Sequence, residues 1–319
     1  MKKNVTRRGK RIMTILAFIL GGIVCLNLIG FAINKVFFSN ELDDITPYGQ
    51  MVEVNGKMMH VYSMGSGEKT IVLLPGFGMA LPSADFGPLM RELSKQYTVV
   101  SIEYFGTGFS DQTETPRTNE NITEEIRIAL SKTGFKPPFI LMPHSVSGVY
   151  SEYYAAKYPD EVSVIIMLDT TSTGKVVSGN PPRFVYDIAV VQQECGLSRL
   201  ASGLVPPLQK TENGYTEKEI NDYKLFAYHV LNNTMIDQSL RTIENINEVN
   251  AMPFPQGIPV LKLIASQTLD KVGQAYQTEH LKRLGSGVES KTIEGTHFIY
   301  HTRAADIRAA TDAFLEKVQ

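Results

Sequence analysis

Short apolar runs alternate with amphipathic helical segments through most of the chain. The apolar runs that predict strands lie at 71–74, 97–102, 139–142, 162–168, 260–265 and 288–293. Between them, apolar residues that repeat with a helical period predict helices at 84–94, 120–133, 148–157, 276–284 and 304–318. Most of these strands are apolar throughout, which is typical of strands buried on both faces. The pattern therefore predicts an α/β fold with a mostly parallel sheet covered by helices on both sides.

Two segments depart from this alternation. Asn55 and Gly56 stand between two short apolar runs, and this predicts a β-hairpin that adds an antiparallel edge to the sheet. Residues 170–257 separate two predicted strands and contain helical patterns at 220–231 and 235–249. Open α/β sheets bind ligands at the carboxyl edge of their strands. We therefore predict that 170–257 form a helical cap over that edge, and that 51–169 and 258–319 form the core.

A long apolar run, residues 12–33, lies near the N-terminus. A helix of this length reaches across the roughly 30 Å hydrocarbon layer of a membrane. Six basic side chains precede the run, and acidic side chains follow it at Glu41, Asp43 and Asp44. The positive-inside rule then makes residues 1–11 a cytoplasmic basic tail and places the body of the protein outside the cell membrane. Residues 34–50 are predicted to be a linker.

A cleaved signal peptide is the main alternative for this run. The apolar region of a signal peptide usually has about 7–15 residues and ends at a small-residue cleavage site. Here the run is longer, and Asn34-Lys35-Val36 follows it with no Ala-x-Ala. The sequence therefore favours an uncleaved transmembrane anchor, while a cleaved signal peptide and a buried helix stay open.

Composition excludes several classes of protein. The chain has 319 residues, of which 43% are hydrophobic and 20% are charged, as in a globular protein with a sizeable core. Its formal net charge of -2 argues against a nucleic-acid-binding protein. Two cysteines cannot build a disulfide scaffold, and the six histidines form no cluster with them that suggests a metal site. No cofactor is expected.

The segment around Ser145 runs from a strand through a sharp turn into a helix. Residues 144–148 (His-Ser-Val-Ser-Gly) follow the predicted strand and lead directly into the predicted helix. This is the setting of a nucleophile elbow, which needs compact residues on both sides of the nucleophile. Ser147 is compact, whereas Pro143 stands where glycine is usual. A serine that only caps the helix is the alternative.

Two other loops carry candidate chemistry. His297 follows the last predicted strand, where a loop can bring an imidazole to a serine on a central strand; an ordinary loop histidine is the alternative. Residues 75–78 (Pro-Gly-Phe-Gly) follow the first parallel strand. The backbone N–H groups of Phe77 and Val146 are candidates to hold a developing oxyanion. An ordinary Pro-Gly turn is the alternative for this loop.

Six segments resemble landmarks of the α/β-hydrolase superfamily and occur in the family's order. They are residues 55–62, 74–78, 103–111, 144–148, 158–162 and 295–297. The resemblance implies a serine hydrolase with Ser145 as the nucleophile, His297 as the base, and Phe77 and Val146 as the oxyanion hole. It also implies that dehalogenase and epoxide-hydrolase branches carry Asp at the nucleophile position, so Ser145 argues against them.

The acid of the implied triad has two candidates. In the superfamily it follows either the strand after the elbow helix or the next strand, beyond the cap. Asp169 directly ends the predicted strand 162–168. On the later strand the usual position falls near Thr268, which is not a carboxylate, so Asp270 needs a longer loop. We favour Asp169 and keep Asp270 as the alternative acid.

These features predict a serine hydrolase that cleaves a carboxylic ester-like bond through an acyl-enzyme. The expected partners are a small acyl or ester substrate and, through the N-terminal helix, the membrane; the oligomeric state is not predicted. Two alternatives stay open. One is an aminopeptidase of the proline iminopeptidase type, in which Asp187 and Glu194 of the cap are available to hold an amino terminus. The other is a binding protein that has the fold without the chemistry.

Overall fold

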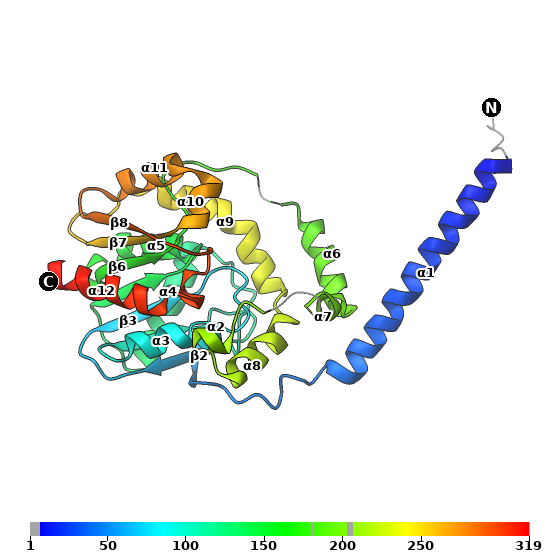
Figure 1. Ribbon diagram of the computed structural model, residues 1–319, viewed down its shortest axis with the longest axis horizontal. Coiled ribbons are helices and arrows are strands. Elements are labelled where there is room, and N and C mark those ends of the chain that lie inside the picture. Colours follow the sequence, from blue (N-terminus) through cyan, green and yellow to red (C-terminus); the bar gives the residue numbers. More distant parts are fainter. Residues whose placement is uncertain (1–6, 180, 203–206, 319) are drawn as a thin grey trace. The chain divides into compact units, whose positions relative to one another are not determined.

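The computed structural model describes residues 7–179, 181–202 and 207–318. Its centre is an eight-stranded sheet with the strand order β1-β2-β4-β3-β5-β6-β7-β8 (Figure 1). The strands are β1 Gln50–Val54, β2 Lys57–Met64, β3 Thr70–Leu74, β4 Thr98–Ile102, β5 Phe139–Pro143, β6 Val162–Leu168, β7 Val260–Ala265 and β8 Val288–Ile293. The pairs β1–β2 and β2–β4 are antiparallel and the others are parallel. The predicted α/β fold with a mostly parallel sheet is confirmed.

The N-terminal edge of the sheet is the predicted hairpin. Asn55 and Gly56 connect β1 to β2 with φ values of 51° and 80°. A two-residue hairpin turn with positive φ at both positions matches the right-handed twist of the strands, and asparagine and glycine adopt that conformation most readily. The hairpin prediction is therefore confirmed, together with its local cause.

Helices cover both faces of the sheet, as Figure 1 shows. On one face, Ile71 and Leu73 of β3 belong to a buried cluster with residues of α3 (Gly87–Leu93) and α12 (Ala304–Val318). On the other face, Val72 and Leu74 belong to a cluster with residues of α4 (Asn119–Lys132) and α5 (Ser147–Lys157). Successive side chains of a strand point to opposite faces, so a strand that is buried on both faces reads as a continuous apolar run.

The helix predicted at 84–94 is two helices, α2 (Pro82–Asp85) and α3, which meet at Phe86. Pro88 explains the break, because proline has no N–H to donate to the carbonyl four residues earlier and its ring crowds that carbonyl. The sequence pattern also missed α10 (Ser266–Val272), which precedes α11 (Gln274–Leu284).

The described part of the insertion between β6 and β7 contains four α-helices: α6 Arg183–Glu194, α7 Leu197–Ser202, α8 Glu217–Ala227 and α9 Asn233–Ala251. A capping box is present at the start of α8, where Thr216 and Glu219 each satisfy a backbone N–H of the other. The sequence pattern missed α6 and α7, which have no capping signal of this kind.

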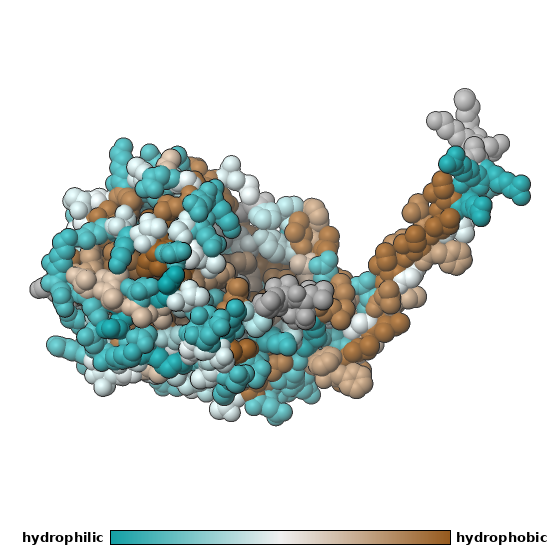
Figure 2. Space-filling model, in the orientation of Figure 1, coloured by the Kyte–Doolittle hydropathy of each residue, from teal (hydrophilic) through white to brown (hydrophobic). Residues whose placement is uncertain are grey.

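The chain forms two compact units. One consists of residues 46–183 and 207–319 and contains the sheet, α8 and α9. The other consists of residues 1–45 and 184–206, so α6 and α7 group with the N-terminal helix α1 (Arg7–Phe38). Among the described helices, α1 is the one that is long and apolar enough to cross a membrane. Figure 2 shows its apolar surface, with hydrophilic residues at its N-terminal end. Lys2 and Lys3 of the predicted basic tail lie outside the described residues.

Candidate active site

The order of the strands places the candidate residues at one edge of the sheet. From β3 the chain moves to β4 on one side and then returns to β5 on the other side of β3. Such a reversal leaves a crevice at the carboxyl ends of the two strands, where open α/β sheets bind ligands. The loop 75–78 follows β3, and Ser145 follows β5. Both segments therefore border the crevice that the topology creates.

Ser145 lies on a sharp turn between β5 and α5. Its φ is 54°, a left-handed conformation that residues other than glycine seldom adopt. Backbone hydrogen bonds hold this conformation, because the Ser145 N–H donates to the Leu168 carbonyl at 3.2 Å and the Thr171 N–H donates to the Ser145 carbonyl at 3.0 Å. A strained backbone conformation of this kind persists only where contacts with the surrounding structure hold it in place. The turn is thus anchored to the end of β6.

The residues around the turn explain how it tolerates Pro143 and Ser147. The paired residues of β5 and β6 stop at Leu141 and resume at a bridge between His144 and Leu168, since Pro143 has no N–H to donate. Ser147 is fully buried, and its hydroxyl bonds to the Pro75 carbonyl and, at 2.9 Å, to the Tyr104 hydroxyl. A serine therefore fits here because its one polar atom has partners.

His297 contacts both Ser145 and a carboxylate. Its Nε2 lies 2.9 Å from Ser145 Oγ, and its Nδ1 lies 2.6 Å from Asp169 Oδ2. The imidazole is 40% exposed, whereas the Asp169 side chain is fully buried. One face of the imidazole is therefore open to a ligand, while the carboxylate behind it is shielded from water.

Asp169 is held by three donors. Besides His297, the Ala265 N–H donates to its Oδ1 at 2.9 Å and the Thr268 hydroxyl donates to its Oδ2 at 2.6 Å. Its backbone, at the end of β6, also adopts a left-handed conformation, with a φ of 46°. Because β6 and β7 are parallel neighbours, the last residue of β7 and the first turn of α10 supply two of the three donors to the acid at the end of β6. The carboxylate is consequently fixed in one orientation.

The structure brings Asp169 to His297 and not Asp270. Asp270 lies on α10, after Thr268. Within the described part of the chain, the Nδ1 atom of His297 is paired with Asp169. Thr268 stands where the superfamily's later acid is usual, and its hydroxyl supports Asp169 instead. The sequence analysis assigned no role to Thr268. Its position, at the usual place of the later acid, was the feature that could have indicated one.

The loop 75–78 passes directly over the elbow. A Cβ atom added to Gly76 would lie 3.0 Å from Ser145 Cβ and 2.6 Å from His144 Nδ1, so only glycine allows this approach. Phe77 is the next residue of the loop, and Val146 follows Ser145 in the chain. The loop therefore brings Gly76, the residue before Phe77, against the serine. The oxyanion role of Phe77 and Val146 stays a prediction.

Two further residues of the site were missed by sequence reasoning. Asp85, buried on α2, accepts hydrogen bonds from Tyr300 at 2.7 Å and from His301 at 2.9 Å. It thereby ties the segment that carries His297 to the helix that follows the loop 75–78. His144 is also buried and lies 3.1 Å from the His297 carbonyl through its Nε2. Since a carbonyl only accepts, His144 carries its proton on Nε2 and donates it.

His144 makes the stability of the fold depend on pH. Burial, followed by the charge of His297, lowers the pKa of His144 to about 3. In the unfolded chain a histidine has a pKa of about 6.5, so between these values the unfolded state binds a proton that the folded state does not. The free energy of unfolding contributed by His144 therefore falls as the pH is lowered from about 6.5 toward 3.

We expect His144→Gln, which keeps an N–H donor but does not titrate, to remove this contribution. The free energy of unfolding, measured by denaturant titration of the detergent-solubilised full chain at pH 7 and pH 5, should fall more for the native protein than for the variant. The buried His280 is present in both proteins and cancels in the comparison. Equal losses in the two proteins would show that His144 does not carry the pH dependence.

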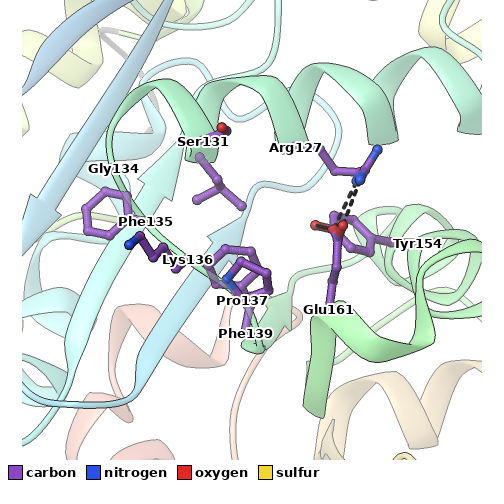
Figure 3. Close-up of a pocket in the computed structure, with 10 residues that line it drawn as sticks. Arg127, Ser131, Gly134, Phe135, Lys136, Pro137, Phe139, Tyr154 and Glu161 are labelled. Carbon is purple, nitrogen blue, oxygen red and sulfur yellow. Dashed lines mark hydrogen bonds and ion pairs between the residues drawn. The ribbon is translucent and has the colours of Figure 1, made fainter.

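A cavity of about 290 Å³ lies at the opposite end of β5 and is a separate feature (Figure 3). It is lined by residues that include Arg127, Phe139 and Glu161. Phe139 is the first residue of β5, whereas Ser145 follows the last. The Arg127–Glu161 ion pair drawn in Figure 3 spans 2.7 Å between guanidinium and carboxylate. This cavity therefore does not include the candidate active site.

The comparison with protein families agrees with the fold. A family model described as the alpha/beta hydrolase fold matches residues 69–299, which is most of the chain. The chain belongs to the α/β-hydrolase fold family. This α/β hydrolase is 29% identical over 289 residues to the uncharacterized protein YbdG of Bacillus subtilis, covering 85% of this chain and 86% of that protein. It is 32% identical over 120 residues to the 2-(acetamidomethylene)succinate hydrolase of Mesorhizobium japonicum, covering 38% of this chain and 42% of that protein.

Solved structures share the fold of this α/β hydrolase. The enol-lactonase from Burkholderia xenovorans LB400 matches with a TM-score of 0.59 and 18% identity, over 84% of this chain and 100% of that one. The epoxide hydrolase VrEH1 from Vigna radiata matches with a TM-score of 0.60 and 18% identity, over 84% and 97%. These neighbours share the fold, and the matched family supports hydrolase activity.

Proposed function

We propose that this protein is a serine hydrolase that cleaves a carboxylic ester-like bond through an acyl-enzyme. The observation that carries the proposal is the continuous contact from Ser145 Oγ through the His297 imidazole to the Asp169 carboxylate, with distances of 2.9 and 2.6 Å. A nucleophile, a base within hydrogen-bond reach, and a third group that orients the base are the parts that nucleophilic catalysis requires.

In the proposed reaction, His297 Nε2 takes the proton of Ser145 as its Oγ attacks the substrate carbonyl. The N–H groups of Phe77 and Val146 hold the oxyanion that forms, and one such donor typically stabilises the transition state by about 3 kcal/mol. Collapse of the tetrahedral intermediate transfers the proton from His297 to the departing alcohol. Water then attacks the acyl-enzyme, with His297 again acting as the base.

Asp169 acts on the imidazole. It keeps the proton of His297 on Nδ1, so that Nε2 is free to accept the proton of Ser145, and it stabilises the imidazolium that follows. The donors Ala265 and Thr268 hold the carboxylate in place, so little reorganisation is needed during the reaction. The enol-lactonase among the neighbours is named for a lactone, which is a cyclic ester, and this supports an ester-like substrate.

The alternatives receive less support. An epoxide hydrolase of this superfamily would, by resemblance, carry Asp where Ser145 stands. The aminopeptidase alternative depended on Asp187 and Glu194, which lie on α6, in the unit that contains α1. The non-catalytic alternative predicts an unreactive serine, so a chemical probe separates it from the proposal.

We expect a fluorophosphonate probe to label the full-length protein at Ser145, because the probe reports a serine that a neighbouring base has activated. Mass spectrometry of the digested protein should place the label on the peptide that contains Ser145. His297→Ala should abolish labelling, whereas His229→Ala, which alters a histidine just after the end of α8, should not. Absence of the label from a folded sample would favour the non-catalytic binding protein.

We also propose that α1 is an uncleaved anchor with its N-terminus in the cytoplasm and the hydrolase unit outside the cell membrane. The basic side chains at the start of α1 (Arg7, Arg8, Lys10, Arg11) support this orientation. A C-terminal alkaline phosphatase fusion should be active, and a C-terminal green fluorescent protein fusion exported by the same route should be dark. The reverse pattern would place the hydrolase unit in the cytoplasm.

A further inference from the structure

The segment formed by α6 and α7 exposes apolar side chains. On α6 the exposed fractions are 60% for Phe184, 54% for Ile188 and 57% for Val191, and these residues repeat with a helical period on one stripe. On α7, Leu200 is 71% exposed. Single exposed apolar residues are common, but a contiguous set on one short segment marks an interaction surface.

The α6–α7 segment is joined to the outer end of α1. Arg199 donates to the Asn34 side chain at 2.8 Å and pairs with the Glu41 carboxylate. The Asn34 side chain in turn donates to the Glu194 carbonyl at 3.2 Å. The Arg199 guanidinium also lies 4.3 Å from the centre of the Phe38 ring. Polar and cation–π contacts therefore fasten the segment at the place where the apolar run of α1 ends.

The contact continues into the apolar run itself. A Cβ atom added to Gly30 would lie 2.5 Å from the Cys195 carbonyl oxygen, so the backbone of the α6–α7 connection touches α1 at a glycine. Gly30 lies inside the run 12–33 that is predicted to span the membrane. Because lipid surrounds a spanning helix at that depth, a segment in contact with Gly30 lies at the level of the acyl chains.

An apolar groove of about 1060 Å³ lies between α1 and α6. Ile23, Leu28 and Phe31 line it from α1, and Phe184, Ile188 and Val191 line it from α6. Ile23 is seven residues before Gly30, which corresponds to about 10 Å along a helix. The groove therefore extends from the outer end of α1 toward the middle of the membrane.

Polar residues also line this groove: Asn27 from α1, and Asp187, Gln192 and Glu194 from α6. Glu194 lies at the outer end of the groove, where its carbonyl accepts from Asn34. Asn27 donates to the Ile23 carbonyl at 2.8 Å, and Asp187 takes part in an interaction of its own. Exposure of the apolar walls to water would cost about 25 cal/mol for each Å². An apolar occupant avoids that cost, and the acyl chains that already surround α1 are continuous with the groove.

We propose that α6 and α7 lie in the membrane leaflet on the hydrolase side, and that acyl chains of membrane phospholipids fill the groove between α1 and α6. The proposal rests on α1 spanning the membrane and is independent of the proposed catalytic chemistry. It makes part of the predicted cap a membrane-embedded element, in addition to the anchor.

The absence of tryptophan from the sequence allows a direct test. Ile188→Trp introduces a single fluorophore at an exposed position of α6 in the full-length chain. After reconstitution into phosphatidylcholine vesicles, we expect lipids with brominated acyl chains to quench at least half of its emission. Aqueous iodide should quench it little. A second variant, Val191→Trp, should behave in the same way.

Two matched variants calibrate the measurement. Leu20→Trp, in the middle of the apolar run, should be quenched by brominated lipid, and Lys132→Trp, exposed at the end of α4, should be quenched by iodide. If Ile188→Trp behaves like Lys132→Trp, the groove lies in water and the proposal is wrong. If it is shielded from both quenchers, another protein chain covers the face and the proposal is also wrong. A Leu20→Trp that brominated lipid does not quench would overturn the anchor itself.

Discussion

Ser145→Ala is expected to lower kcat for a short-chain nitrophenyl ester by roughly a millionfold, the typical loss when the serine of such a triad is removed. The reason is that Ser145 Oγ is the hydroxyl that, among the described residues, lies 2.9 Å from His297 Nε2 in position to be deprotonated and attack the carbonyl. Weak activity above the water rate should remain, because the oxyanion site and substrate binding stay in place. The measurement is the steady-state rate with the full-length protein in detergent.

The fold should survive this substitution, since Ser145 is partly exposed and alanine removes one hydroxyl group. Circular dichroism and the denaturation midpoint will verify this. Ser163→Ala is a matched control, because the Ser163 hydroxyl bonds to the Phe139 carbonyl at the other end of β5. Its kcat should be unchanged. A folded Ser145→Ala protein with more than about one hundredth of native activity would contradict the proposed nucleophile.

Asp169→Asn is expected to lower kcat by about ten-thousandfold, the typical effect of replacing the acid of such a triad with its amide. Both carboxylate oxygens of Asp169 accept hydrogen bonds, from Ala265, Thr268 and His297. An asparagine must present its NH₂ group to one side of this set. If that group faces His297, the imidazole moves its proton to Nε2 and can no longer accept the proton of Ser145.

Asp270→Asn provides the contrast, because it makes the same chemical change on α10. Its kcat for the same ester should stay close to that of the native protein, as expected for a side chain that does not contact His297. The reverse result, with a large loss for Asp270→Asn and a small loss for Asp169→Asn, would identify Asp270 as the acid. Comparable losses would mean that neither residue alone orients the imidazole.

Sequence patterns predicted the structure reliably where it depends on interactions between residues close together in the chain. The hairpin at Asn55 and Gly56 and the capping box at Thr216 both formed, because each depends on residues that are neighbours in the chain. The continuous apolar strands predicted a sheet that is buried on both faces. The break between α2 and α3 was missed although its cause, Pro88, is also local.

Contacts between distant segments were harder to predict. The roles of Thr268, Asp85 and His144 arise from hydrogen bonds across 99, 216 and 153 residues of sequence. No periodicity or motif encodes such pairs. The helices α6 and α7 were missed for a related reason, because they group with α1, which is distant in the sequence, and not with the sheet.

The sequence by itself determined the α/β-hydrolase fold, the apolar N-terminal helix, and the candidates Ser145 and His297, since motif order and apolar periodicity are properties of the linear chain. It left Asp169 and Asp270 as alternative acids. Only the tertiary structure distinguished the contacts of these two side chains. The ends of β6 and β7 become neighbours when the sheet forms, and the turned backbone at Asp169 then directs its carboxylate to His297 while Thr268 supports it.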